Sequence, residues 1–322
     1  MRVLVTGGNG FLGSHVAERL ASRDGIELRL LLRPTSGLEF LKGVAFERAE
    51  GDIRDAESLA RAVQGVDAVI HLAGLTSART EAEYQEVNVL GTAAVVQAAR
   101  AAGVKRFVYV SSLAALGPSA DGAMPQTPHP ISAYGRSKLG GEFPVLAERD
   151  AISVAVLRPP VVYGERDRAL IPFYRLARYG FVPVYGNGER LLTWVHIHDA
   201  AGAIVATALA DGPSGAVYSI SDGNTYTWRR LVQAYAKATG RTVRALPTPP
   251  ALYTLAGYAG GLVQTILRKP LPLSPEEVTQ MRQRAWICDH AAITRDLGWQ
   301  PSIGIEQGFA QAYRWYTQQG WL

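Results

Sequence analysis

The feature that most constrains the fold of this chain is a glycine-rich turn near its N-terminus. Residues 6–13 read TGGNGFLG and directly follow the apolar run Val3-Leu4-Val5, and residues 14–22 have the pattern of a helix. This order predicts a short buried strand, a tight turn and the start of a helix, where free backbone N–H groups and the helix dipole bind a dinucleotide pyrophosphate. An ordinary structural turn is the alternative, and the position of the run between strand and helix favours the nucleotide site.

The three spaced glycines of this turn have separate steric roles. Gly7 permits the tight turn, Gly10 lets the backbone approach a phosphate where a Cβ would collide, and Gly13 lets the helix pack closely on the strand. We therefore expect a strand, turn and helix arranged as a dinucleotide-binding unit.

Length and composition limit the remaining classes of protein. The 322 residues, 48% of them apolar, suffice for one large domain or for one domain with an added lobe. The single cysteine, Cys288, rules out an internal disulfide framework, and no signal segment precedes the first strand, so we expect a cytoplasmic protein. The net charge of +5 comes from scattered arginines, so no nucleic-acid partner is expected.

Strand-like and helix-like segments alternate along the first half of the chain. Apolar, β-branched runs occupy residues 2–5, 27–32, 45–47, 68–72, 107–111 and 154–157. The longest helices are expected at residues 81–102 and 133–149. This alternation predicts an α/β fold, a doubly wound parallel sheet of the Rossmann type with helices on both faces.

Beyond Gly164 the alternation fades, and Pro, Gly and aromatic residues become frequent. We therefore predict a smaller C-terminal substrate-binding lobe, formed by residues 166–189 and 223–322. Residues 1–165 and returning segments within about 190–222 are assigned to the dinucleotide-binding domain, with late strands at 193–197 and 216–220 returning to its sheet.

Ligands of open parallel sheets lie beyond the carboxyl ends of the strands. Arg33 follows the second strand, where an NAD enzyme usually carries an acidic residue for the ribose 2′-hydroxyl; a cation there favours NADP(H) slightly over NAD(H), and a solvated arginine is the alternative. Asp52 follows the third strand and either accepts a hydrogen bond from adenine or serves as a turn or cap residue. The fourth strand is followed by residues that let the backbone lie against the cofactor, Leu72, Ala73 and Gly74.

Three polar residues after the fifth strand can move a proton. Ser112 follows that strand directly, and Tyr134 and Lys138 are four residues apart, which places them on one face of a helix. A nearby ammonium group is expected to lower the pKa of the Tyr134 phenol from near 10 towards neutrality. Tyr134 would then act as a general acid or base on a carbonyl or alcohol whose oxygen Ser112 also binds. A surface pair is the alternative, although so few lysines make this spacing uncommon by chance.

Together these motifs resemble the extended short-chain dehydrogenase/reductase superfamily, in its NAD-dependent epimerase/dehydratase group. The family's order and spacing are found in TGGNGFLG, GDIRD, HLAG, NVLGT, VSSLAALG, YGRSK and LRPPVVYG, and the likeness continues at residues 194–199 and 297–299. The resemblance implies a catalytic triad of Ser112, Tyr134 and Lys138, with Lys138 also holding the nicotinamide ribose and Asn88 supporting the site. The cofactor contacts that it implies are Gly7, Gly10, Phe11, Leu12, Gly13, Asp52, Ile53, Leu72, Ala73, Gly74, Tyr134, Lys138 and Pro159.

The match to nucleotide-sugar members weakens at the substrate positions. They usually carry RPxN after the sixth strand, where this chain has Arg158-Pro159-Pro160-Val161, and their diphosphate-binding arginine is displaced here to Arg190. The double proline, the apolar Val161 and Val162 and the apolar stretch 251–267 look more like the branch with dihydroflavonol reductases, 3β-hydroxysteroid dehydrogenases and a hopanoid-associated sugar epimerase. Substrate contacts are expected from Thr76, Ser112, Val161 and Arg190.

The leading hypothesis is an NAD(P)-dependent oxidoreductase that transfers hydride at a secondary alcohol or ketone of an apolar small molecule, with Tyr134 as acid/base. The alternatives are a nucleotide-sugar epimerase and a non-catalytic dinucleotide-sensing module. The resemblance further implies a homodimer that packs helices 81–102 and 133–149 into a four-helix bundle.

Three further features have structural interpretations. Residues 251–267, followed by Arg268 and Lys269, are expected to form a packed helix without stable membrane insertion, and membrane contact is the alternative. His196 and His198 alternate on a predicted strand and so face opposite sides, and no metal site is expected. A solvated helix face is expected for the basic stretch, with contact to an acidic substrate group as the alternative; it comprises Arg166, Arg168, Arg175 and Arg178.

Overall fold

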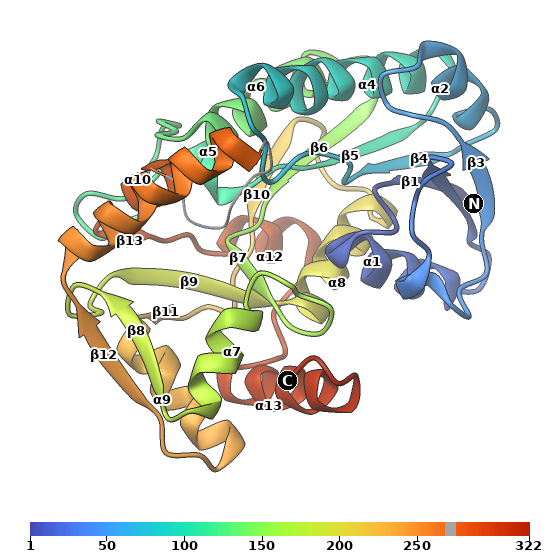
Figure 1. Cartoon of the computed structure of the whole chain (residues 1–322). Helices are drawn as coiled ribbons and strands as arrows, with labels where there is room; N and C mark the ends of the chain where they lie inside the picture. The colour runs from blue at the N-terminus through green and yellow to red at the C-terminus, as the bar shows by residue number, and fades with distance from the viewer. Residues whose placement is uncertain (268–274) are drawn as a thin grey trace.

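The central element of the protein is a parallel sheet of seven strands. The computed structural model describes residues 1–267 and 275–322. All neighbouring strands of the sheet pair in parallel, in the order β10-β6-β5-β4-β1-β2-β3 (Figure 1). The strands are β1 (Arg2–Thr6), β2 (Glu27–Leu32), β3 (Glu47–Glu50), β4 (Ala68–His71), β5 (Arg106–Val110), β6 (Ser153–Arg158) and β10 (Ala216–Ser219).

Helices cover both faces of this sheet. Val3 and Val5 of β1 belong to the core that contains α1 (Phe11–Ala21) and α8 (Ile197–Leu209). Leu4, between them, points to the opposite core, because successive strand residues alternate between faces. That second core is covered by α2 (Ala56–Ala62), α4 (Gly91–Ala101) and α6 (Ala133–Ala147) (Figure 1). The predicted doubly wound Rossmann architecture is confirmed.

Two of the predicted strands differ from those in the structure. The third strand, expected at residues 45–47, is β3 at Glu47–Glu50, an edge strand of sequence ERAE. The strand expected at 193–197 is β9 (Leu191–His196), and the prediction that it returns to the main sheet was wrong. It pairs instead with β7 (Val161–Tyr163), β11 (Thr225–Tyr226) and β13 (Ala285–Trp286). The residue pattern of a strand does not identify the strand with which it pairs. The other predicted late strand, β10, does join the main sheet.

The long helix predicted at residues 81–102 contains a widened turn. It consists of α3 (Glu81–Tyr84), a π-helical segment (Gln85–Leu90) and α4, which follow one another without a break. Such π-helical turns are uncommon and often mark functional positions. The π-helical segment carries the buried Asn88.

The second lobe is held together mainly by aromatic side chains. Phe173 stacks on Phe309 with ring centroids 5.8 Å apart, and Trp194 and Tyr235 join the same core. The large rings fill the space between short elements. The remaining elements are η1 (Glu39–Leu41), α5 (Leu113–Leu116), α7 (Ile171–Arg178), β8 (Phe181–Tyr185), α9 (Trp228–Thr239), β12 (Arg244–Thr248), α10 (Pro250–Leu267), α11 (Pro275–Met281), α12 (Ala291–Leu297) and α13 (Ile305–Gln318).

The apolar stretch 251–267 forms α10, so the predicted helix is confirmed, but the expectation that it is packed was wrong for Leu252, Leu255 and Tyr258, which are exposed. Within the ranges that the structure describes, no helix combines the length and apolarity that crossing a membrane requires. Arg268 and Lys269 lie outside the described residues.

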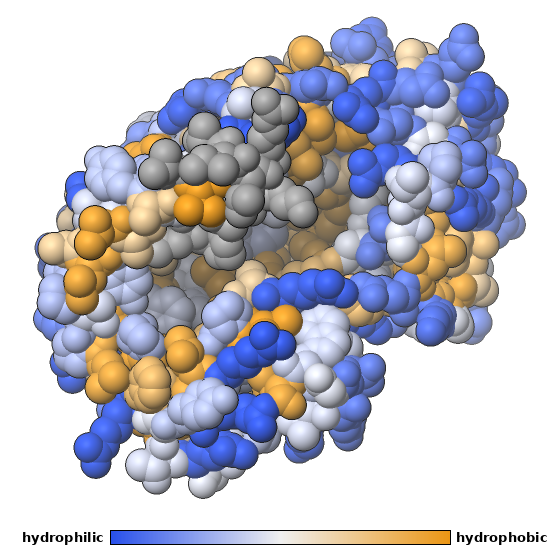
Figure 2. All heavy atoms as spheres, viewed as in Figure 1, coloured by the Kyte–Doolittle hydropathy of each residue, from blue (hydrophilic) through white to orange (hydrophobic). Residues whose placement is uncertain are grey.

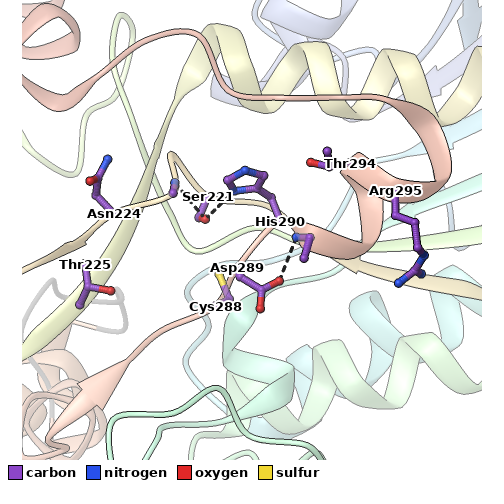
Figure 3. Close-up of a pocket in the computed structure, with 10 residues that line it drawn as sticks. Ser221, Asn224, Thr225, Cys288, Asp289, His290, Thr294 and Arg295 are labelled. Carbon is purple, nitrogen blue, oxygen red and sulfur yellow. Dashed lines mark hydrogen bonds between the residues drawn. The ribbon is translucent and has the colours of Figure 1, made fainter.

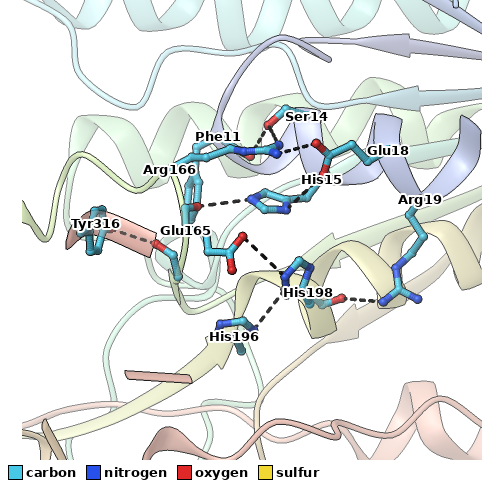
Figure 4. A network of polar contacts seen from close by, with 11 residues as sticks. Phe11, Ser14, His15, Glu18, Arg19, Glu165, Arg166, His196, His198 and Tyr316 are labelled. Atoms are coloured by element: carbon cyan, nitrogen blue, oxygen red, sulfur yellow. Dashed lines mark hydrogen bonds and ion pairs between the residues drawn. The ribbon is translucent and has the colours of Figure 1, made fainter. Parts of the chain in front are cut away.

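The loop after β7 fastens the second lobe to α1 (Figure 4). Arg166 donates a hydrogen bond to Ser14 Oγ at 3.0 Å and forms an ion pair with Glu18. His15 Nε2 lies 3.3 Å from the carbonyl oxygen of Glu165. Arg166 has a φ of 70°, the only positive φ at a non-glycine residue of the described chain. These contacts hold it in a backbone conformation that side chains disfavour.

The basic stretch is therefore not the single solvated helix face that was predicted. Only Arg175 and Arg178 lie in α7, whereas Arg166 precedes the helix and its side chain is 14% exposed. Arg168 also precedes the helix and pairs with Glu39 at 2.8 Å. Both loop arginines bind acidic residues of the dinucleotide-binding side.

The predicted separation of the two neighbouring histidines was also wrong. β9 ends at His196 and α8 begins at Ile197, so His198 is not on the strand. The rings of His196 and His198 are 5.3 Å apart, and His198 lies 5.1 Å from His15 (Figure 4). No group of three or more His, Cys, Asp or Glu residues suited to a metal ion occurs in the described part of the chain.

We expect the substitution His15→Gln to weaken the acid dependence of stability. Burial lowers the pKa of His15 from 6.5 to about 3, so between these values the unfolded chain binds a proton that the folded chain does not. Stability therefore falls as the pH drops from 6.5 to 3, and the variant removes up to about one proton from this difference. Urea unfolding of both proteins across this pH interval measures the slope; equal slopes would contradict the prediction.

Candidate active site

The glycine turn has the shape that a pyrophosphate site requires. Gly7 has a φ of 72°, and a Cβ there would lie 2.7 Å from the backbone nitrogen of Ala73. A Cβ at Gly13 would lie 2.0 Å from the carbonyl oxygen of Gly7, so the close packing predicted for Gly13 is against the turn itself. At Gly10 the nearest atom to a Cβ is 3.4 Å away, which leaves room on that side.

The start of α1 supplies the donors for this site. Gly10 is the N-cap of α1, and the first turn contains no acidic side chain. The first backbone N–H groups of a helix have no partner within it, here those of Phe11, Leu12 and Gly13. The room beside Gly10 and these donors fit the pyrophosphate of a dinucleotide.

The chain after β4 lies directly beside the turn. Leu72 donates its backbone N–H to the carbonyl of Thr6 at 3.1 Å, and Ala73 donates to Thr6 Oγ1 at 3.2 Å. His71 Nδ1 lies 2.6 Å from the same hydroxyl. The structure thus brings the predicted Leu72 and Ala73 next to the glycine turn, and Gly74 lies beside Asn88 and Lys138.

Asp52 and Arg33, which are expected near the adenosine part of the cofactor, follow the neighbouring strands β3 and β2. Asp52 accepts hydrogen bonds from the backbone N–H and the guanidinium of Arg54, each at 3.0 Å, and these bonds lower the pKa of Asp52. This is the turn role that was the alternative for Asp52. Ile53 is buried beneath Gly91. The side chain of Arg33 is exposed and forms no ion pair within the described part of the chain.

Ser112, Tyr134 and Lys138 converge at the carboxyl end of β5. Ser112 caps α5, with its Oγ accepting the N–H of Ala114 at 3.1 Å, and its side chain is hydrogen-bonded to Tyr134. Lys138 is buried, and its Nζ donates to the carbonyl of Val110, the last residue of β5, at 2.7 Å. Pro159 is held nearby, since its carbonyl accepts the N–H of Leu113 at 2.8 Å.

The predicted direction of the Tyr134 pKa was wrong. Burial raises the pKa of Tyr134 above 10, against a smaller lowering by the hydrogen bond with Ser112. Burial also lowers the pKa of Lys138 from 10.5 to about 7, so this amine carries only part of a charge at neutral pH. For both groups the loss of solvation on burial is the largest cause of the shift in pKa. Tyr134 therefore keeps its proton at neutral pH and is a hydrogen-bond donor.

Asn88 connects the chain after β4 to helix α6. Its Oδ1 accepts the N–H of Leu75 at 2.7 Å, and its amide donates to the carbonyl of Leu75 and to Ser137 Oγ, both at 2.9 Å. A Cβ at Gly74 would lie 2.9 Å from Asn88 Oδ1 and 3.8 Å from Lys138 Nζ. The supporting role that the resemblance implies for Asn88 thus has a geometric basis.

Sequence reasoning missed one residue of this support, Glu142. It is 1% exposed and lies on α6 four residues after Lys138. Its carboxylate accepts hydrogen bonds from Ser111 Oγ at 2.5 Å and from the Arg158 guanidinium at 2.9 and 2.6 Å. Glu142 therefore joins the ends of β5 and β6 next to the helix that carries Tyr134 and Lys138. An acidic residue at the same helical spacing as Tyr134 and Lys138 was the available signal.

The expected substrate residues do not form one cluster. Thr76 is exposed, and Val161 at the start of β7 is 41% exposed. Arg190 lies in a separate pocket of about 430 Å³ with Arg282 and Arg284, and burial lowers the pKa of Arg190 to about 10. Figure 2 shows the visible face hollowed between the sheet and the lower lobe, with many hydrophobic residues in its walls.

A further pocket lies on the side of β10 and α12 (Figure 3). It has a volume of about 520 Å³ and contains none of the predicted site residues. His290 Nδ1 lies 3.3 Å from Ser221 Oγ at its wall, and Cys288 is buried behind it.

Comparison with known proteins agrees with this geometry. The NAD dependent epimerase/dehydratase family model matches residues 3–221. A ceramide reductase of Caulobacter vibrioides is 32% identical over 99% of this chain and 96% of its own length. A 2-alkyl-3-oxoalkanoate reductase of Stenotrophomonas maltophilia is 31% identical over 96% and 97%.

A solved structure extends the agreement to the fold. The dTDP-glucose 4,6-dehydratase of Streptomyces venezuelae with NAD bound superposes with a TM-score of 0.77, at 29% identity over 100% of this chain and 98% of that one. The site binds an NAD(P)-type dinucleotide, and the protein is an enzyme. This chain belongs to the NAD-dependent epimerase/dehydratase family of extended short-chain dehydrogenases/reductases.

Proposed function

We propose that this enzyme is an NAD(P)H-dependent reductase of a ketone, or dehydrogenase of the corresponding secondary alcohol, on a small molecule with a long apolar part. The observation that carries the proposal is the convergence of Tyr134, Ser112 and Lys138 at the carboxyl end of β5, beside the glycine turn of a dinucleotide site. Two relatives support the substrate class, since they are named for a ceramide and a 2-alkyl-3-oxoalkanoate, which both carry alkyl chains. The lobe of residues 166–189 and 223–322 would bind this apolar part.

In this proposal each side chain has one task. Tyr134 donates its phenolic proton to the carbonyl oxygen as that oxygen becomes an alcohol. Ser112 holds the same oxygen with its hydroxyl, and Lys138 binds the cofactor ribose. The dinucleotide, when bound, supplies the hydride. A raised pKa suits the reducing direction, because the phenol is then protonated at neutral pH.

The cofactor that we propose is NADP(H) rather than NAD(H). Arg33 is exposed at the end of β2 and is free to pair with a 2′-phosphate. Asp52, at the neighbouring strand end, is hydrogen-bonded to Arg54 and has only a weaker Coulombic interaction with Arg33.

Net consumption of the nicotinamide cofactor tests the reaction type. Purified protein with a long-chain 3-keto ester and NADPH is expected to oxidise one NADPH per ketone reduced, with NADH less effective. Arg33→Asp should reverse this preference by about tenfold or more, because it replaces an attraction for phosphate by a repulsion. Identifying any dinucleotide that the denatured protein releases, by mass spectrometry, gives the same preference independently.

The second candidate is a nucleotide-sugar epimerase. The observation that favours it is the likeness to the dehydratase of known structure, together with the arginines around the 430 Å³ pocket. An epimerase oxidises and then reduces its substrate with the same cofactor. Conversion of UDP-glucose or dTDP-glucose without net NAD(P)H consumption would replace the reductase proposal. A non-catalytic sensing module is least supported, since Ser112, Tyr134 and Lys138 are all in place.

We also propose a homodimer that packs α4 and α6 against the same helices of a second copy. Leu90, at the start of α4, is 65% exposed and Phe143 of α6 is 64% exposed, which large apolar side chains rarely are without a partner. Light scattering at micromolar concentration should give the mass of a dimer, and a monomeric mass would exclude this assembly.

A further inference from the structure

Helix α10 presents large apolar side chains to solvent, which is unusual for a surface helix. Thr254 and Gly257 are on its inner side, whereas Leu252, Leu255 and Tyr258 point outward and are 55%, 68% and 66% exposed. Figure 2 shows hydrophobic residues along this helix at the left edge of the molecule. The hydrophobic effect normally buries such side chains, so this surface is built to be covered.

The inner side of α10 is anchored close to the catalytic helix. Tyr253 packs on Tyr185, with ring centroids 5.4 Å apart, and α10 packs along α11. In α11, Glu276 accepts a hydrogen bond from the backbone N–H of Ala133, the residue before Tyr134. The outward face of α10 is thus joined through one further helix to the start of α6, where Tyr134 lies (Figure 1).

Positive charge lies beside this apolar face. Arg282 is exposed and donates a hydrogen bond to Thr254 of α10 at 3.1 Å. With Arg190 and Arg284 it lines the 430 Å³ pocket, and none of the three arginines forms an ion pair with a residue that the structure describes. The acidic residue of that pocket, Glu189, is paired with Arg229 at 3.1 Å. The chain contains no Asp or Glu between residues 223 and 261.

We propose that α10 docks this enzyme on the surface of a membrane that contains anionic lipids. Leu252, Leu255 and Tyr258 enter the boundary between headgroups and acyl chains, and the neighbouring arginines bind the headgroups. The helix lies in the interface and does not cross it. A second copy of the chain is a poorer partner, because a two-fold contact through α10 would bring like-charged arginines together.

This proposal extends the proposed function and rests on it, because docking benefits the enzyme only if its substrate is an apolar ketone. A membrane holds apolar ketones at high local concentration, and docking through α10 brings that reservoir to the side of the enzyme on which Tyr134 lies. The docking itself does not depend on catalysis and is measured without substrate.

The test is co-sedimentation of the purified protein with phospholipid vesicles. We expect binding to vesicles of phosphatidylglycerol and phosphatidylcholine that weakens with added salt, and much less binding to phosphatidylcholine alone. Leu255→Glu should reduce the partition into anionic vesicles at least about tenfold, because it places a charge in the apolar face. The matched control is Tyr179→Ser after α7, where an 80% exposed ring lies outside α10, and it should bind like the wild type.

Several outcomes would overturn the proposal. Wild-type protein that stays in the supernatant would do so, as would Leu255→Glu binding as tightly as wild type. If Leu255→Glu changes the mass measured by light scattering and leaves vesicle binding unaffected, the partner of the α10 face is a second copy of the chain instead of a membrane.

Measuring the reduction of a short, water-soluble ketone distinguishes a failure of the docking proposal from a failure of the reductase proposal. Leu255→Glu should retain this activity without vesicles, because the side chain of Leu255 lies 68% exposed on the surface of α10. Vesicle binding that Leu255→Glu abolishes, in a protein that reduces no ketone, would uphold docking while the reductase assignment fails.

Discussion

Tyr134→Phe should lower kcat about 10²- to 10⁴-fold while the Kd for NADPH changes little. The substitution removes only the phenolic oxygen, which in our proposal delivers the proton to the ketone. Lys138 keeps its hydrogen bond to Val110, and Asn88 keeps its bonds to Leu75, so the cofactor site remains. Steady-state reduction rates and NADPH fluorescence titration measure the two quantities.

Tyr84→Phe is the matched control. The ring of Tyr84 is 6.0 Å from that of Tyr134, and its hydroxyl is hydrogen-bonded to the carbonyl of Thr76, at 3.4 Å, and to the backbone of Ala78. Its loss should change kcat by no more than a few fold. Equal losses in both variants would show that the aromatic packing matters, and full activity of Tyr134→Phe would remove Tyr134 from the mechanism.

Gly13→Ala should weaken dinucleotide binding about 100-fold, because an ångström-scale shift of a binding turn has effects of this size. The added Cβ would lie 2.0 Å from the carbonyl oxygen of Gly7 and 2.9 Å from the Cα of Gly8. Both are backbone atoms, so the turn itself must move. Forcing a methyl group into such packing should also cost about 1–3 kcal/mol of stability.

Gly37→Ala is the control for any general effect of replacing a glycine of this protein by alanine. A Cβ at Gly37 meets no atom within 4 Å. Its Kd for NADPH and its Tm should match those of the wild type. Wild-type affinity in Gly13→Ala would mean that the turn relaxes at no cost, and the pyrophosphate site would then have to lie elsewhere.

The sequence predicted best those elements whose residue pattern is dictated by burial. β1, β2 and β6 are covered on both faces and consist largely of apolar runs, so their positions were found within a residue or so. β3 is an edge strand in which Glu47 binds Arg29 and Glu50 lies near Arg48, and its charged residues carry no apolar signal. The pairing of β9 depends on long-range packing, which a local pattern does not contain.

For the candidate site, the residue types were predictable and their electrostatics were not. Spacing placed Tyr134 and Lys138 on one helix face, and the structure brings Tyr134 to Ser112 and Lys138 to the carbonyl of Val110. The pKa of Tyr134 depends on how deeply both groups are buried, and that depth results from the packed fold. Glu142 was missed for the same reason, since only the fold reveals that its helix face meets β5 and β6.

The fastening of loop 164–170 to α1 determines where the molecule can open. Arg166 and Arg168 tie this loop to Glu18 and Glu39, at the end of the protein that receives the dinucleotide. Figure 1 places α1 and α10 on opposite sides of the molecule. We therefore expect motions that admit a bulky substrate to pivot at the nucleotide end and to be widest beside α10 and α11, so that a small-molecule ligand exchanges there while the dinucleotide stays bound.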